Sequence, residues 1–134
     1  MPGTLMSKLK VTVRVDFDRD TAIGPGKIAL LERMRDSGSL SQAARDLDMS
    51  YRRAWQLLSN LNRSFREPLV LTAVGGSGGG GSTLTPLAEK VIAAYREFER
   101  DINTRAADHF GALAQAVAPT SGGTRRSVRR SATK

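Results

Sequence analysis

Apolar and polar residues follow two different periods along the chain, and each period predicts a type of element. Between Lys8 and Phe17 every second residue is apolar, which is typical of a half-buried strand. Further along, apolar residues recur at every third or fourth position, which is typical of amphipathic helices. Helices are therefore predicted at about 27–37, 39–48, 50–65 and 86–117, with short strands at 69–74 and 82–84.

Residues with strong positional preferences stand at the predicted helix ends. Ser39 is followed three positions later by Gln42, which is the spacing of a capping box. Ser50 is a second N-cap residue, and Gly38 stands where a left-handed C-cap belongs. At 85–86 a threonine precedes proline, the residue preferred at the first helical position. These signals divide the middle of the chain into three short helices.

The order of these elements predicts a winged helix-turn-helix. Two helices separated by a turn of about four residues are followed by a hairpin. We expect a mainly α fold of the α+β type, with a small β-hairpin wing, an N-terminal strand and a long C-terminal dimerisation helix. The expected organisation is a flexible N-terminus at 1–7, the domain at 8–117 with its dimerisation helix at about 86–117, and a disordered basic tail at 118–134.

The net charge narrows the class of partner. The chain has 21 Lys and Arg residues against 13 Asp and Glu residues, a net charge of +8. Such a charge favours nucleic acid or an anionic membrane surface. There is no cysteine, and no apolar run approaches the ~20 residues that are needed to cross a membrane. We therefore expect a cytoplasmic protein with no membrane partner.

The third predicted helix carries side chains that suit DNA. The stretch 50–66 contains four arginines and no acidic residue, so its polar face is basic and amide-bearing. Arginine can bind guanine with two hydrogen bonds, and glutamine can pair with adenine. The first turns of such a helix reach deepest into the groove, so Arg52, Arg53 and Gln56 are predicted to contact base edges. The other polar residues of the helix are predicted to contact phosphates or the groove wall. The alternative is that this face is only exposed to solvent. The predicted DNA-binding residues are Ser50, Tyr51, Arg52, Arg53, Gln56, Ser59, Asn60, Arg63 and Arg66.

The remaining candidates for chemistry are weak. The acidic residues show no paired arrangement suited to acid–base catalysis. His109, the single histidine, has no cysteine or second histidine with which to build a metal site. We expect no enzymatic activity, no catalytic residue, no cofactor and no metal. Trp55, the single tryptophan, is predicted to anchor the third helix to the core.

The glycine-rich stretch V-G-G-S-G-G-G-G-S-T-L-T at 74–85 admits several interpretations. Its glycines fit G-x-G-x-x-G, but the loop does not lead directly into a helix and no G-K-[ST] follows, so neither a dinucleotide site nor a P-loop is predicted. A linker is a further alternative. Because the flanking runs complete a hairpin, we interpret the stretch as a mobile wing tip. Its predicted residues are Gly76, Ser77, Gly78, Gly79 and Gly80.

The chain resembles the N-terminal DNA-binding domain of ModE-type molybdate-responsive transcriptional regulators, which are relatives of the LysR-type winged helix. The matching segments are I-G-P-G-K-I-A-L-L-E (23–32), S-G-S-L-S-Q-A-A-R (37–45), M-S-Y-R-R-A-W (49–55), N-R-S-F-R-E-P-L-V (62–70) and G-G-S-G-G-G-G-S-T-L-T-P (75–86). The resemblance extends over about 8–110 and implies that 50–56 belongs to the recognition helix and 75–81 to the wing tip. Family wings often hold a basic residue where this chain has Ser77.

The resemblance also implies a homodimer on a palindromic operator, because members of this family dimerise through their first and last helices. The length of the last predicted helix, about 48 Å for some 32 residues, supports the same expectation. The alternative is that this helix ends near Gly111 and folds back on its own domain. The predicted dimer-interface residues are Ile28, Leu31, Val91, Tyr95, Phe98 and Ile102.

Three functions are compatible with these patterns. The first is a sequence-specific transcriptional regulator that binds double-stranded DNA as a homodimer. The second is a binder or sensor of molybdate or another small oxyanion, although no part of this sequence resembles the C-terminal molybdate-binding domains of full-length ModE proteins. The third is a winged-helix module for protein–protein interaction, against which the purely basic third helix argues.

Overall fold

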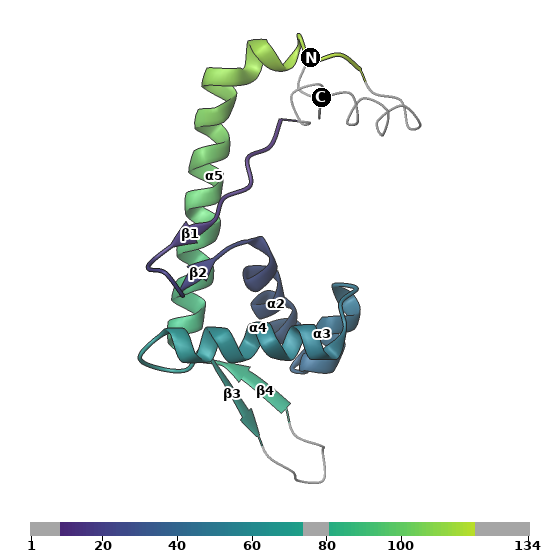
Figure 1. Cartoon of the computed structure of the whole chain (residues 1–134), viewed down its shortest axis with the longest axis vertical. Coiled ribbons are helices and arrows are strands. Elements are labelled where there is room, and N and C mark those ends of the chain that lie inside the picture. Colours follow the sequence, from purple (N-terminus) through teal and green to yellow (C-terminus); the bar gives the residue numbers. More distant parts are fainter. Residues whose placement is uncertain (1–8, 74–80, 120–134) are drawn as a thin grey trace. The chain divides into compact units, whose positions relative to one another are not determined.

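A computed structural model describes residues 9–73 and 81–119, and within these ranges helices alternate with two short hairpins (Figure 1). Contacts divide the chain into two units, of which the larger spans 11–102; the described part of the other consists of 9–10 and 103–119. The elements are β1 (Val15–Asp16), β2 (Ala22–Ile23), α2 (Pro25–Ser37), α3 (Leu40–Asp46), α4 (Tyr51–Ser64), β3 (Val70–Ala73), β4 (Gly81–Leu84) and α5 (Pro86–Ala114).

The expected N-terminal strand is much shorter than its alternating pattern. Only β1 forms a ladder, antiparallel to β2, with Val15 opposite Ile23. The ladder is short because Pro25 begins α2 two residues after β2 ends. The alternation itself persists as burial, since Val11, Val13 and Val15 are half-buried while the residues between them are exposed. The expectation of a strand over 8–17 was therefore right about the buried face at Val11, Val13 and Val15, but wrong about Phe17, which is 60% exposed, and about the length of the ladder.

The core of the larger unit lies where α2, α3, α4 and the wing strands meet. Side chains from α2 and α4 fill its centre, and β3 and the first turns of α5 close it. The long apolar residues that are almost completely buried are Ile28, Leu30, Leu31, Met34, Leu61 and Leu69. Small residues, among them Ala43, Ala44 and Ala54, are buried on α3 and α4. Their size allows these two helices to approach closely, as the sequence predicts for Ala44.

The helix ends follow the local signals of the sequence. Gly38 has a left-handed φ of 70° and caps α2, and its N–H donates to the carbonyl of Met34. The hydroxyl of Ser39 accepts a hydrogen bond from the N–H of Gln42 at 3.0 Å. Only this half of the expected capping box is formed, because the Gln42 amide group is engaged with Asp46 and the Arg45 guanidinium. Thr85 likewise caps α5, where Pro86 is the first helical residue.

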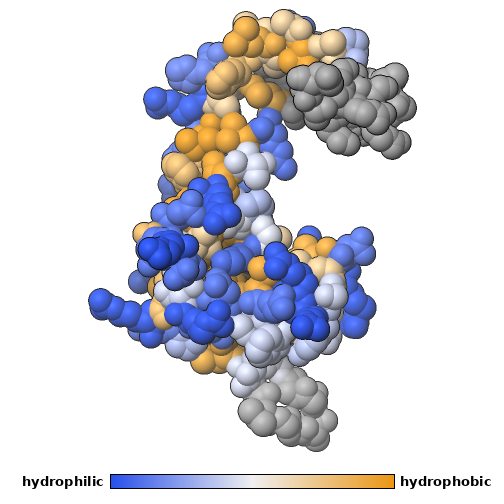
Figure 2. Space-filling view, in the orientation of Figure 1, coloured by the Kyte–Doolittle hydropathy of each residue, from blue (hydrophilic) through white to orange (hydrophobic). Residues whose placement is uncertain are grey.

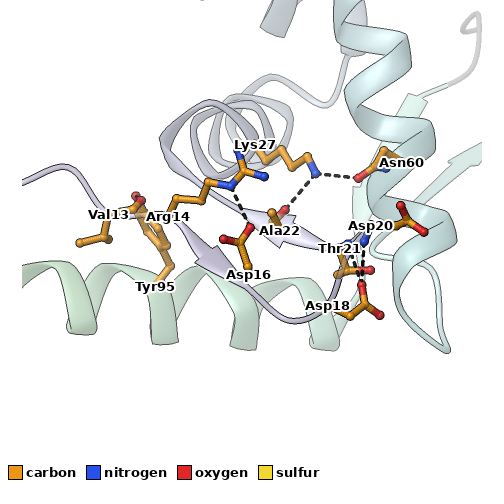
Figure 3. A network of polar contacts seen from close by, with 10 residues as sticks. All are labelled: Val13, Arg14, Asp16, Asp18, Asp20, Thr21, Ala22, Lys27, Asn60 and Tyr95. Carbon is orange, nitrogen blue, oxygen red and sulfur yellow. Dashed lines mark hydrogen bonds and ion pairs between the residues drawn. The ribbon is translucent and has the colours of Figure 1, made fainter.

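Helix α5 has 29 residues and a length of about 44 Å at 1.5 Å per residue. It continues through Gly111 and ends at Ala114, three residues from both the predicted end at 117 and the alternative end near Gly111. Its first turns belong to the larger unit, where Ala88 and Ile92 are buried in the core. In that unit the Tyr95 hydroxyl donates to the carbonyl of Val13 at 2.8 Å, which fixes the N-terminal segment against α5 (Figure 3).

Candidate nucleic-acid interface

The turn between α3 and α4 sets the angle at which α4 is presented. Asp48 lies in the left-handed region with φ of 59°. The N–H of Asp48 donates to the carbonyl of Arg45, and the N–H of Met49 donates to that of Ala44. These two bonds form a Schellman motif, in which the left-handed position is commonly glycine and here is aspartate. The turn is therefore a closed, hydrogen-bonded structure in which α3 and α4 are held at a fixed geometry.

Helix α4 begins at a well-formed cap and has one strongly buried face. The hydroxyl of Ser50 accepts the N–H of Arg53 at 3.0 Å, so this side chain serves as the N-cap. Ala54, Leu58 and Leu61 are buried against the core. Because a helix turns about 100° per residue, these positions leave the opposite side of α4 to solvent. The exposed side contains Arg52, Gln56 and Arg63.

The arginines of α4 are exposed, and within the described residues they form no ion pair. In the described part of the chain, no hydrogen bond or ion pair joins the guanidinium groups of Arg52, Arg53 or Arg63 to another residue. Arg66, just beyond the helix, is also exposed. Figure 2 shows hydrophilic side chains gathered where α4 crosses the view. The surface is thus a positively charged helix face whose charge is not neutralised within the described residues.

A lysine extends this positive surface beyond α4. The Lys27 ammonium on α2 donates to the carbonyl of Ala22 at 2.9 Å and to Asn60 Oδ1 at 2.6 Å (Figure 3). Burial lowers the pKa of Lys27, and the nearby positive charges of Arg14 and Arg53 lower it further. Lys27 thus adds a positive charge beside Arg53, whereas the guanidinium of Arg14 is paired with Asp16 at 2.9 Å. Neither Lys27 nor Arg14 was among the sequence-predicted DNA-binding residues, because they are brought to α4 only by the packing of β1, β2 and α2.

The opposite flank of α4 is attached to the wing. Asn62 accepts the N–H groups of Leu69 and Val70 at 2.8 and 3.1 Å, and its amide donates to the carbonyl of Val70 at 3.2 Å. The wing strands pair in register from Val70 opposite Leu84 to Ala73 opposite Gly81. At the other edge, Ser82 donates its N–H to the carbonyl of Gly38 at 3.0 Å. These bonds hold the base of the wing at a set position beside α4.

The predicted DNA-binding residues divide into exposed and structural ones. The side chains of Arg52, Arg53, Gln56, Arg63 and Arg66 are exposed, as is Tyr51. By contrast, Ser50 is occupied as a cap, and half-buried Asn60 accepts the bond from Lys27. Ser59 is half-buried. The wing residues Gly76, Ser77, Gly78, Gly79 and Gly80 lie outside the described residues, as do most of the predicted N-terminal and C-terminal tails.

Trp55 corrects one sequence-based expectation. Its side chain is 54% exposed, and so is that of Tyr51 one turn earlier. Trp55 therefore does not anchor α4 to the core; Ala54, Leu58 and Leu61 do so. The helical period alone places position 55 away from the buried face. The prediction instead relied on the large size of the tryptophan side chain.

The predicted dimer-interface residues also separate by burial. Ile28 and Leu31 are completely buried in the core of the single chain, and Tyr95 is 4% exposed. These three side chains stabilise the protomer and offer almost no surface to a second copy. Phe98 is 44% exposed, and Val91 and Ile102 are half-buried. Of the six predicted dimer-interface residues, these last three are the ones that keep side-chain surface accessible in the single chain.

No group of three or more His, Cys, Asp or Glu side chains is arranged to hold a metal ion within 9–73 and 81–119. Among the helices in those ranges, none has the length and apolar character to cross a membrane.

Comparison with known proteins agrees with this architecture. Residues 26–89 match the family described as bacterial regulatory helix-turn-helix protein, lysR family. The chain is 35% identical over 96 residues to the molybdenum transport protein ModE of Azotobacter vinelandii, which covers 70% of this chain and 36% of that protein. It is 41% identical over 71 residues to the DNA-binding transcriptional dual regulator ModE of Escherichia coli strain K12, covering 53% and 27%.

A third relative is the molybdenum-pterin-binding protein MopB of Rhodobacter capsulatus, 41% identical over 80 residues that cover 60% of this chain and 30% of that protein. The chain thus spans about a third of the length of the curated relatives it matches. The family match extends from α2 through both wing strands into α5. It confirms the resemblance to ModE-type proteins and the winged helix-turn-helix class that the sequence predicts.

Proposed function

We propose that this chain, whose residues 26–89 form a helix-turn-helix domain of the lysR family, is a sequence-specific DNA-binding transcriptional regulator. The observation that supports this most strongly is the exposed face of α4, whose arginines have no acidic partner in the described part of the chain. A phosphate backbone is the polyanion that would neutralise such a face. One relative bears the name DNA-binding transcriptional dual regulator, which agrees with this assignment.

In this proposal α4 lies in the major groove. The first turns of a recognition helix reach deepest, so Arg52 and Gln56 would contact base edges and supply the specificity. Arg53, together with Lys27, would contact the backbone along one flank. Arg63, near the end of α4, would contact phosphate as well. Binding would be strongly salt-dependent, because each neutralised phosphate releases counterions.

The proposal includes a homodimer on a palindromic site. A two-fold dimer would place its two α4 helices in successive major grooves, about 34 Å apart. The partly exposed residues Val91, Phe98 and Ile102 on α5 are the candidates for the contact. Sedimentation equilibrium of the chain and of Phe98→Glu tests this: we expect a dimer that the substitution converts to monomer. A monomeric parent chain would refute the dimer without touching the DNA-binding assignment.

The direct test of function is selection from a random duplex library. We expect the chain to enrich one motif and to bind it about a thousandfold more tightly than random duplex at the same salt concentration. Equal affinity for both duplexes would show a non-specific polyanion binder. Absence of binding to either would instead favour a protein–protein module.

A further inference from the structure

The recognition helix carries an exposed aromatic pair that the basic character of α4 does not explain. Tyr51 and Trp55 are each 54% exposed although they are the helix's largest side chains. They are four positions apart, so they lie one above the other on the same side of α4. Neither side chain belongs to the core cluster or to the half-buried apolar residues packed against it. A large apolar surface left open on a charged helix indicates a contact with a partner.

Hydrogen bonds show which flank of α4 carries this pair. Trp55 and Asn62 are seven positions apart, so they point in nearly the same direction from the helix axis. Asn62 binds Leu69 and Val70, and the aromatic flank is therefore the wing side. Arg53 and Asn60 are also seven positions apart, and Asn60 binds Lys27, so the cationic flank faces β1, β2 and α2.

The polar face of α4 thus has three parallel strips. The middle strip contains Arg52, Gln56, Ser59 and Arg63. It is bordered by cations on one side and by Tyr51 and Trp55 on the other. Because the aromatic pair is continuous with the strip proposed to enter the major groove, duplex DNA is the partner that covers both at once. This step depends on the function proposed above.

The chemistry of the major groove identifies what an aromatic strip would contact there. The bases present hydrogen-bond donors and acceptors, with one apolar group, the C5-methyl of thymine. Arginine and glutamine bind the donors and acceptors, and an indole or phenol ring packs against the methyl group. We propose that Trp55, with Tyr51, contacts thymine methyl groups and sets a preference for thymine on the wing side of each half-site. The pair thereby adds an apolar component to a recognition surface that otherwise reads hydrogen bonds.

Deoxyuridine tests this proposal, because it differs from thymidine in the major groove only by the missing methyl group. Using the duplex selected by the parent chain, each thymidine is replaced singly by deoxyuridine and the affinity is measured at fixed salt. We expect a loss of about threefold to tenfold at one or two positions, from the burial of a single methyl. Trp55→Ala should bind the thymidine duplex about tenfold more weakly and should no longer distinguish thymidine from deoxyuridine at those positions.

Trp55→Phe is the matched control and should retain the discrimination, with circular dichroism confirming that both variants fold. If no single replacement weakens binding, or if Trp55→Ala distinguishes the two bases as well as the parent does, the proposal is wrong. In both cases the selected motif itself would still support DNA-binding. If the parent chain selects no motif, the function proposed above fails first, which separates the two outcomes.

Discussion

Arginines have two different environments in this protein, and the difference separates structure from recognition. Between α2 and α5, Arg96 binds both carboxylate oxygens of Glu32 at 2.7 and 2.9 Å and Glu99 at 2.7 Å. Arg35 binds Glu89 at 2.8 Å between the same two helices. On α4, by contrast, the described residues offer Arg52, Arg53 and Arg63 no acidic partner. A neutralised arginine holds two helices together, whereas an unneutralised one is available to a polyanion.

The ionisation of the paired groups reflects this difference. The hydrogen bond from Arg96 lowers the pKa of Glu32, although desolvation opposes the shift. The hydrogen bonds that Arg96 donates to Glu32 and Glu99 raise the pKa of Arg96 further above its usual range. Folding therefore stabilises the charged forms of Glu32 and Arg96. The arginines of α4 form no ion pair within the described residues, so we expect them to contribute to DNA binding and little to the stability of the folded chain.

The largest effect on stability is expected from the paired side. Arg96→Ala removes three charged hydrogen bonds and leaves Glu32 and Glu99 half-buried without that partner. We expect a loss of about 2–3 kcal/mol in the free energy of unfolding, measured by urea denaturation. The affinity of the folded variant for DNA should be unchanged. Arg100→Ala, at an exposed position of α5, is the control and should change stability by less than about 0.5 kcal/mol.

The converse effect is expected from α4. Arg52→Ala should weaken binding to the selected duplex by about 1–3 kcal/mol and binding to random duplex by less, whereas Arg53→Ala, assigned to the backbone, should weaken both alike; stability should be nearly unchanged in both variants. Fluorescence anisotropy on selected and random duplexes distinguishes the roles. Equal losses on both would assign that arginine to phosphate. A loss of stability comparable with that of Arg96→Ala would contradict the separation of structural arginines from DNA-binding arginines.

Asn62 sharpens the comparison, because it is a structural side chain on the recognition helix. Asn62→Ala leaves the N–H groups of Leu69 and Val70 without their acceptor. We expect a loss of about 1–2 kcal/mol in the free energy of unfolding. Asn62→Asp loses the amide hydrogen donated to the Val70 carbonyl but keeps an acceptor for both N–H groups, so it should lose less stability than Asn62→Ala. A urea titration in which both variants are equally unstable would refute the acceptor role.

The smallest expected effect is a pH dependence of the stability that the Arg96–Glu32 pair contributes. Since the pKa of Glu32 is lower in the folded state, its stabilisation is present above the unfolded value of about 4.5 and is lost as pH falls through the folded pKa. Glu32→Gln should therefore be less stable than the parent by about 1 kcal/mol at pH 7, and the gap should shrink below about pH 4. A gap of constant size across this range, in urea titrations at each pH, would contradict a charge-based role.

Local signals made much of the fold predictable. The caps at Gly38, Ser39 and Ser50 are encoded by neighbouring residues, and the structure places each helix end within a few residues of the expected position. The turn at Asp48 was located, but its left-handed conformation was not predicted because aspartate is an uncommon residue there. The extent of β1 depends on its partner strand, which Pro25 limits, and no property of 8–17 reveals that limit.

The site was predictable as far as it lies on one helix. The exposed arginines of α4 follow from the helical period, whereas Lys27 and Asn62 acquire their roles from contacts across the fold. The same applies to Arg96 and Glu32, which are 64 positions apart. Ile28 and Leu31 show the reverse error: apolar residues on a first helix suited a dimer contact, but the single chain buries them completely.

The most direct test of the central claim, that the exposed face of α4 lies against DNA, uses the absence of cysteine from the chain. A cysteine carrying an iron chelate that cleaves DNA is introduced at Gln56 on α4 or, as the control, at Glu97 on α5, both of which are exposed. The claim predicts strand cleavage within the selected site from position 56 and little or none from position 97. Cleavage from position 97, with none from a position 56 variant that still binds, would contradict it.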